Sequence, residues 1–194
     1  MKGHEIKIRL ATAGDVGAAS ATLADAFAAY PWTQWTVDAD CHAVRVQRVQ
    51  AICLARIAVP HGLVVVTDDC TAVAAFTPPG VSEMVEPQVW EEIAEISGAG
   101  FDNASVVDLP STLVEDSWEL ATVGVASGEQ GRGLGSAVLE FGLHTLDRFS
   151  GKKTPVHLET SDARNVVLYE RLGFAAHART EIPGGPTVWS MQRM

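Results

Sequence analysis

A glycine-rich segment follows a short apolar run in the second half of the chain. Residues 121–125 read ATVGV, and residues 130–136 read QGRGLGS. A β-branched run, a glycine-dense turn and then a helical period predict a strand whose end leads through a turn into a helix. Glycines let successive backbone N–H groups converge, and the helix dipole adds about half a positive charge at that end. We therefore expect this turn to bind phosphate.

Two common phosphate-binding loops fit the spacing poorly. A P-loop requires Lys and then Ser or Thr after its last glycine, whereas Gly135 is followed by Ser136 and Ala137. A dinucleotide fingerprint requires G-x-G-x-x-G, but these glycines fall at every second position and Ser136 stands in place of the third. The P-loop is excluded, and the dinucleotide site is weakly supported.

The remaining pattern, Q-x-x-G-x-G at 130–135, resembles the pyrophosphate loop of the GNAT superfamily of acetyl-coenzyme A-dependent N-acetyltransferases. A second segment strengthens the resemblance, because residues 158–161 read LETS and residues 170–174 read ERLGF. Between these two runs, Asn165 and Tyr169 lie one turn apart on the apolar face of a predicted helix. Thr160 or Ser161 is expected to cap this helix, and Gly173 to end it in the left-handed conformation.

The sequence is also similar to a narrower family, the puromycin N-acetyltransferases. Residues 8–12 (IRLAT), 25–31 (DAFAAYP) and 181–189 (EIPGGPTVW) carry this likeness together with the two coenzyme motifs. It runs nearly end to end and is weakest over residues 79–115, which could shape the acceptor pocket. The resemblance implies an α/β (α+β) GNAT fold, a mixed central sheet whose splayed central parallel strands are flanked by helices. It also implies acetyl-coenzyme A (acetyl-CoA) as co-substrate and a small-molecule amine as acceptor, with puromycin or a related antibiotic as the candidate.

The same resemblance implies which residues hold the coenzyme. They belong to the end of the central strand, the glycine-rich turn and the second motif: Val123, Gly124, Val125, Gln130, Gly131, Arg132, Gly133, Leu134, Gly135, Ser136, Asn165 and Tyr169. The central strand would splay from its parallel neighbour and hold the pantetheine arm through free backbone groups. A backbone N–H near Val125 would then face the thioester oxygen, as an oxyanion-hole donor does.

Attack of an amine on a thioester also needs a base for the ammonium proton and an acid for the departing thiolate. Tyr169 is the candidate acid, because its phenol carries a proton at neutral pH. Glu119 is the candidate base, at the offset before Gln130 where histone acetyltransferases of the superfamily carry their glutamate. Simple strand alternation would place Glu119 on one face with Val123 and Val125. A structural carboxylate paired with a cation is the alternative interpretation of Glu119, and Glu159 is a second candidate base.

Aromatic residues near the start of the chain offer a surface for the acceptor. Tyr30, Trp32 and Trp35 could sandwich a planar substrate, although a core or dimer contact would explain them equally well. A homodimer is therefore one expectation for the assembly.

Alternating strands and helices are expected to position these residues. Predicted elements are a strand at 6–10, helices at 16–30 and 37–59, a hairpin of 63–67 with 72–77, a helix at 86–97, the central strand, and two short strands after Phe174. We expect one domain over residues 1–194.

Composition limits the function classes. The formal net charge is −10, with 47% hydrophobic and 20% charged residues. This charge disfavours nucleic acid and anionic membranes as partners and tolerates a cationic amine. The three cysteines and six histidines show no metal-binding spacing, so no metal is expected. The first residues lack the apolar core of a signal peptide, which favours a cytoplasmic protein. Two other function classes fit the motifs, a protein or peptide N-acetyltransferase and a non-catalytic acyl-CoA-binding sensor.

Overall fold

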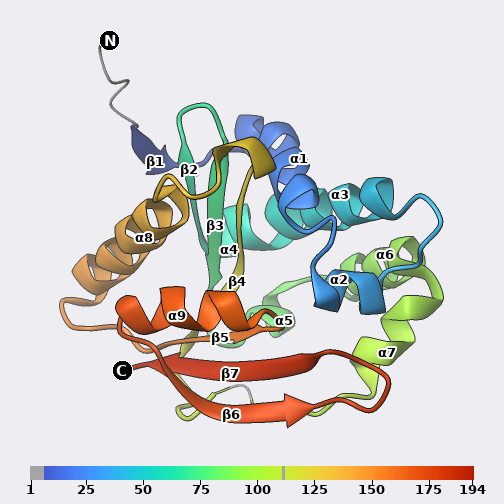
Figure 1. Ribbon diagram of the computed structural model, residues 1–194. Coiled ribbons are helices and arrows are strands. Elements are labelled where there is room, and N and C mark those ends of the chain that lie inside the picture. The colour runs from blue at the N-terminus through green and yellow to red at the C-terminus, as the bar shows by residue number, and fades with distance from the viewer. Residues whose placement is uncertain (1–6, 111) are drawn as a thin grey trace.

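The computed structural model describes residues 7–110 and 112–194, which form a mixed sheet with helices on both faces (Figure 1). The strand order is β1-β2-β3-β4-β5-β7-β6, with β4 and β5 parallel and the other neighbours antiparallel. The strands are β1 (Ile8–Leu10), β2 (Leu63–Thr67), β3 (Ala72–Thr77), β4 (Trp118–Val125), β5 (Val156–Thr160), β6 (Ala175–Glu181) and β7 (Thr187–Arg193). This confirms the predicted mixed sheet flanked by helices.

The helices are α1 (Val16–Ala26), α2 (Pro31–Thr36), α3 (His42–Ile52), α4 (Val59–His61), α5 (Val81–Met84), α6 (Pro87–Ser97), α7 (Phe101–Ser105), α8 (Leu134–Ser150) and α9 (Ala163–Arg171). A π-helical turn, Cys53–Ala58, joins α3 to α4. Within the described part of the chain, no helix is long and apolar enough to cross a bilayer.

Several predicted boundaries were wrong. The helix predicted over 16–30 ends at Ala26, and a separate helix, α2, starts at Pro31, where proline suits the first helical position. The helical run predicted over 37–59 begins only at His42 and passes through the π-helical turn. The first strand was expected from Ile6, which lies outside the described residues.

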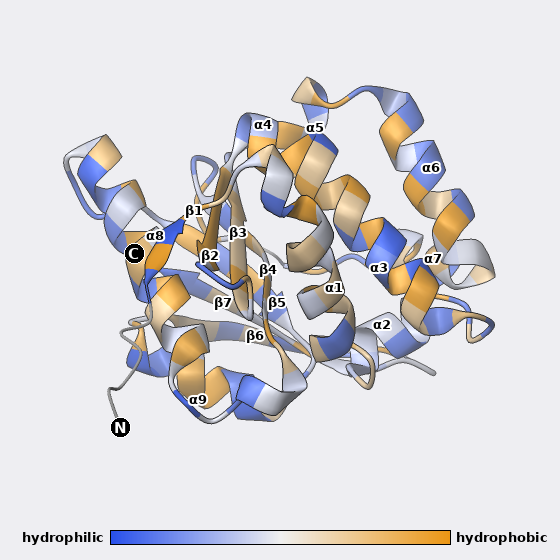
Figure 2. Ribbon diagram, turned by 90° about the horizontal axis from the view of Figure 1, so that it is seen from above, coloured by the Kyte–Doolittle hydropathy of each residue, from blue (hydrophilic) through white to orange (hydrophobic). Residues whose placement is uncertain are grey.

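Two apolar layers hold the helices to the sheet. On one face of the sheet, Phe76 and Leu120 pack with Leu139 of α8. On the other face, Val73 and Ala75 belong to the apolar cluster that includes side chains of α1. β2 and β3, the strands that lie between these helices, are strongly hydrophobic (Figure 2). Burial on both faces fixes the central strands, because a one-residue slip would turn their side chains to the wrong face.

A β-bulge in the central strand changes the alternation of side chains. Ala75 pairs with Thr122 and Phe76 pairs with Leu120, so Ala121 is an extra residue in β4. Residues before the bulge therefore face the opposite side from the one that simple alternation predicts.

The two central parallel strands diverge along most of their length. β4 pairs with β5 only at Trp118↔Val156 and Glu119↔His157. Beyond Glu119, β4 stays paired with β3 and separates from β5. The splayed parallel strands that the resemblance implied are present in the structure.

The replacement Gly142→Ala tests the contact between α8 and the sheet. A Cβ at Gly142 would lie 2.8 Å from Phe76 Cζ and closer still to Phe76 Cε2. We expect the variant to lose about 1–3 kcal/mol of unfolding free energy, although alanine favours a helix more than glycine does. Gly17→Ala in α1 is the matched control, because its Cβ meets no atom within 4 Å. Denaturant unfolding should show the control equal to or more stable than the parent, and a Gly142→Ala variant of parent stability would contradict the close contact.

Candidate active site

The glycine-rich turn has the conformation that its sequence predicts. Gly131 (φ 77°) and Gly133 (φ 81°) lie in the left-handed region, and a Cβ on either would meet no atom within 4 Å. The first backbone hydrogen bond of α8 runs from the Ala137 N–H to the Gly133 carbonyl at 3.0 Å. The N–H groups of the preceding first turn therefore stay available at the positive end of the helix dipole. This geometry suits a pyrophosphate.

Side chains fix this turn to its surroundings. Gln130 Nε2 donates to the carbonyl of Val125 at 3.1 Å, and the Ser127 N–H donates to Asp25 Oδ2 at 2.6 Å. Arg132 forms an ion pair with Glu129 at the surface. The end of β4 and the start of α8 are thereby held in a defined relative position.

The second motif forms α9, with one correction. Asp162, not Thr160 or Ser161, caps the helix, because its carboxylate accepts a hydrogen bond from the Arg164 N–H at 2.9 Å. Gly173 (φ 85°) ends the helix as predicted, and the Phe174 N–H donates to the Tyr169 carbonyl at 3.1 Å.

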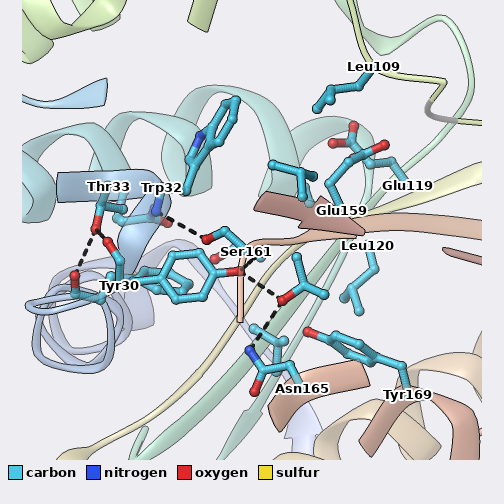
Figure 3. Close-up of a pocket in the computed structure, with 17 residues that line it drawn as sticks. Tyr30, Trp32, Thr33, Leu109, Glu119, Leu120, Glu159, Ser161, Asn165 and Tyr169 are labelled. Atoms are coloured by element: carbon cyan, nitrogen blue, oxygen red, sulfur yellow. Dashed lines mark hydrogen bonds between the residues drawn. The ribbon is translucent and has the colours of Figure 1, made fainter. Parts of the chain in front are cut away.

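A cavity of about 350 Å³ occupies the place where β4 and β5 diverge (Figure 3). It collects side chains from α2, α3, α9, both splayed strands and the segment before β4. Its lining comprises Phe27, Tyr30, Trp32, Thr33, Gln50, Leu109, Glu119, Leu120, Ala121, Thr122, Val123, Glu159, Thr160, Ser161, Asn165, Tyr169 and Val188. Residues from distant parts of the sequence thus share one site, which is near the lower end of the usual volume range for small-molecule pockets.

Tyr169 is buried and lines this cavity, and its ring lies edge-on to Phe174 at 5.9 Å between centroids. Burial, with smaller contributions from Tyr30 and Asp162, raises the Tyr169 pKa well above its ordinary value. The phenol therefore keeps its proton at neutral pH, as a proton donor must. Asn165 lines the same cavity and donates to Thr160 Oγ1 at 3.4 Å.

Glu119 also reaches the cavity, but not by the predicted alternation. It pairs with Thr77 and lies on the face opposite to Val123, because the bulge intervenes. Burial raises the Glu119 pKa, and a 3.3 Å hydrogen bond from Thr77 Oγ1 opposes that rise. Glu159 comes from the paired strand, and the two carboxylates lie at the same end of the cavity, away from Tyr169 (Figure 3). The structure thus gathers both candidate bases and the candidate acid, and their catalytic roles stay predictions.

The three predicted acceptor-binding aromatics separate in space. Tyr30 and Trp32 line the cavity, and the Tyr30 hydroxyl accepts from the Ser161 N–H at 2.8 Å. Trp35 is outside the lining, and its ring packs where a Cβ on Gly185 would lie, 2.8 Å from Trp35 Cε2. Tyr30 and Trp32 therefore border the cavity, while Trp35 packs against the turn between β6 and β7, and a role in acceptor binding stays a prediction.

Sequence reasoning missed Gln50, Thr122 and Leu109, which also line the cavity. Gln50 is one of several polar residues on α3, and no motif distinguishes it. Thr122 was hidden because the bulge decides which β4 side chains face the site. Leu109 is the lining residue that comes from the divergent segment 79–115.

The chain matches known proteins in sequence and in fold. The model of the "Acetyltransferase (GNAT) family" matches residues 84–174. A mycothiol acetyltransferase of Corynebacterium glutamicum is 36% identical over 56 residues, which are 29% of this chain and 19% of that protein. The match thus spans about a fifth of that relative.

Three solved structures share the fold over nearly the whole chain. "Histone acetyltransferase HPA2 and related acetyltransferase" from Corynebacterium glutamicum has a TM-score of 0.73 at 22% identity, covering 98% of this chain and 96% of its own. A putative acetyltransferase from Salmonella typhimurium with its cofactor acetyl-CoA has a TM-score of 0.55 at 21% identity, and the match covers 97% of this chain and 93% of that chain. Drosophila melanogaster polyamine N-acetyltransferase has a TM-score of 0.63 at 17% identity, and the match covers 97% of this chain and 99% of that chain. At these identities the three structures show the fold alone.

The model of the GNAT family thus matches a little under half of the chain, and the solved acetyltransferase structures share its fold over nearly the whole length.

Proposed function

We propose that the protein transfers an acetyl group from acetyl-CoA to a primary amine of a small molecule, by direct attack in a ternary complex. The observation that carries this proposal is the cavity between the diverging strands, which Glu119 and Tyr169 line and which extends along β4 to Val123, two residues before the strand ends. One site therefore offers a coenzyme cradle, a base and an acid.

The coenzyme would lie along the open edge of β4. The Ala126 N–H donates to the Thr71 carbonyl next to β3, so by alternation the Val125 N–H points toward the diverging β5. The Gly131–Gly133 turn has room for the pyrophosphate, and the Val125 N–H can face the thioester oxygen. When bound, the coenzyme supplies the activated acetyl group.

The side chains of this chain supply the proton transfers. Glu119 accepts the ammonium proton of the acceptor, and its raised pKa makes it a better acceptor near neutrality. Tyr169, at the other end of the cavity, donates its phenolic proton to the departing sulfur (Figure 3). The two groups occupy separate positions, which suits proton removal from one reactant and proton delivery to the other.

Puromycin is the first acceptor to test, because the resemblance covers most of the chain. The small cavity admits a small amine or only the amine-bearing end of a larger molecule. Release of free thiol from acetyl-CoA should be measured with puromycin, aminoglycosides, polyamines and lysine peptides. A preference for lysine peptides would favour a protein acetyltransferase, and coenzyme binding without turnover would favour a sensor.

The replacement Gly133→Val tests the coenzyme site. We expect acetyl-CoA to raise the melting temperature of the parent protein, because a ligand that binds only the native state stabilises it. NADH and ATP should leave it unchanged. Valine at φ 81° is strained and obstructs the turn, so the acetyl-CoA shift should disappear. Gly151→Val is the matched control, since Gly151 (φ 68°) ends the same helix far from the turn. Equal acetyl-CoA shifts in both variants would overturn the assignment of the turn.

The replacement Tyr169→Phe tests the proton donor. It keeps the ring that packs on Phe174 and removes only the phenolic proton. We expect kcat to fall by about 10²-fold or more while acetyl-CoA affinity changes little. Steady-state kinetics and a coenzyme titration measure the two quantities, and a parental kcat would reduce Tyr169 to a packing residue.

The replacement Glu119→Gln tests the base through pH. Near neutrality the acceptor is mostly ammonium and needs a base, so kcat/KM should fall, and the defect should shrink at high pH where the amine loses its proton unaided. Thermal unfolding separates this role from a structural one. Because folding raises the Glu119 pKa, its ionisation opposes folding above that pKa, and glutamine should leave the melting temperature equal or higher. A rate defect that is independent of pH would argue against proton removal.

A further inference from the structure

The cavity wall is rich in hydrogen-bond acceptors. Two carboxylates, Glu119 and Glu159, face it, and none of the described residues that line it is Lys, Arg or His. Two further oxygens, Gln50 Oε1 and Thr122 Oγ1, are buried and have no hydrogen-bond partner among the described residues. A ligand that complements this wall is cationic and brings more than one hydrogen-bond donor.

Gln50 lies on the part of α3 that approaches the candidate base. Three residues later, Cys53 begins the π-helical turn, and its thiol is close enough to Glu119 for an electrostatic interaction with that carboxylate. Burial and, next, Glu119 raise the Cys53 pKa to about 11. Gln50 and Cys53 share a helix face, and Gln50 lines the same small cavity as Glu119.

A buried carbonyl oxygen without a donor costs free energy, and native proteins seldom leave one unpaired. Gln50 Oε1 therefore marks a position where a ligand N–H or O–H would be received. The reacting amine itself must approach Glu119, which leaves Gln50 for a different donor on the same molecule.

We propose that the acceptor carries a second hydrogen-bond donor close to its reacting amine, and that Gln50 Oε1 receives this donor. The inference rests on the proposed acetyl transfer and names the class of acceptor. Short diamines meet the condition, and so do α-amino amides, which include the aminoacyl end of puromycin. Gln50 is then a specificity-determining residue.

Two probe amines and three variants test the inference. The probes are 1,3-diaminopropane, which carries the second donor, and propylamine, which lacks it. The measured quantity is the ratio of their kcat/KM values per reactive amino group, compared between enzymes so that the intrinsic reactivity of each amine cancels. We expect Gln50→Met, which keeps the length of the side chain but removes the carbonyl, to lower this ratio by about tenfold to a hundredfold. Propylamine turnover should change little.

Gln50→Glu retains an acceptor oxygen and should keep the preference for the diamine. Gln47→Met is the matched control, because Gln47 is exposed one turn earlier on α3. Melting temperature and acetyl-CoA affinity report whether each variant is folded. A ratio that is unchanged in Gln50→Met, or equal losses with both amines, would overturn the role of Gln50 alone. Absence of transfer to every amine would overturn the proposed function and this inference with it.

Discussion

Divergence of two parallel strands is the constraint on which the site depends. A buried strand edge must find partners for its N–H and C=O groups, and β4 finds them on β5 only at Trp118 and Glu119. From Leu120 to Val123 the strand lines the cavity, and beyond it the Gln130 side chain donates to the Val125 carbonyl. An opened sheet thus provides a row of backbone groups that an extended ligand can use, and the glycine-rich turn lies at the end of the row.

Rigid packing on both faces keeps the opening in place. β4 remains paired with β3, and the β3 side chains are buried under α8 on one face and under α1 on the other. The close approach of Gly142 to Phe76 brings α8 onto the sheet. Tyr30 and Trp32 connect α2 to the end of β5 through Ser161. The site is therefore built on regular elements, which hold functional groups more tightly than loops do.

Stability and chemistry oppose each other at Glu119. Burial of a carboxylate disfavours its charged form, and the Thr77 hydroxyl compensates only in part. The same burial moves the pKa of Glu119 toward the range where a base works at neutral pH. Under the proposed function, a cationic acceptor would compensate the carboxylate for the solvation that burial removes.

Local sequence patterns determined the parts of the protein that depend on neighbouring residues in the chain. The glycine-rich turn follows from glycine conformations, the end of α9 follows from Gly173, and the hairpin of β2 and β3 follows from two short apolar runs with a polar turn between them. Tertiary structure decided the rest. The bulge at Ala121 set the face of Glu119, packing against Gly185 removed Trp35 from the cavity, and the approach of α3 brought Gln50 to it. These outcomes depend on contacts between segments far apart in the chain, and the periodicity of a single segment carries no information about them.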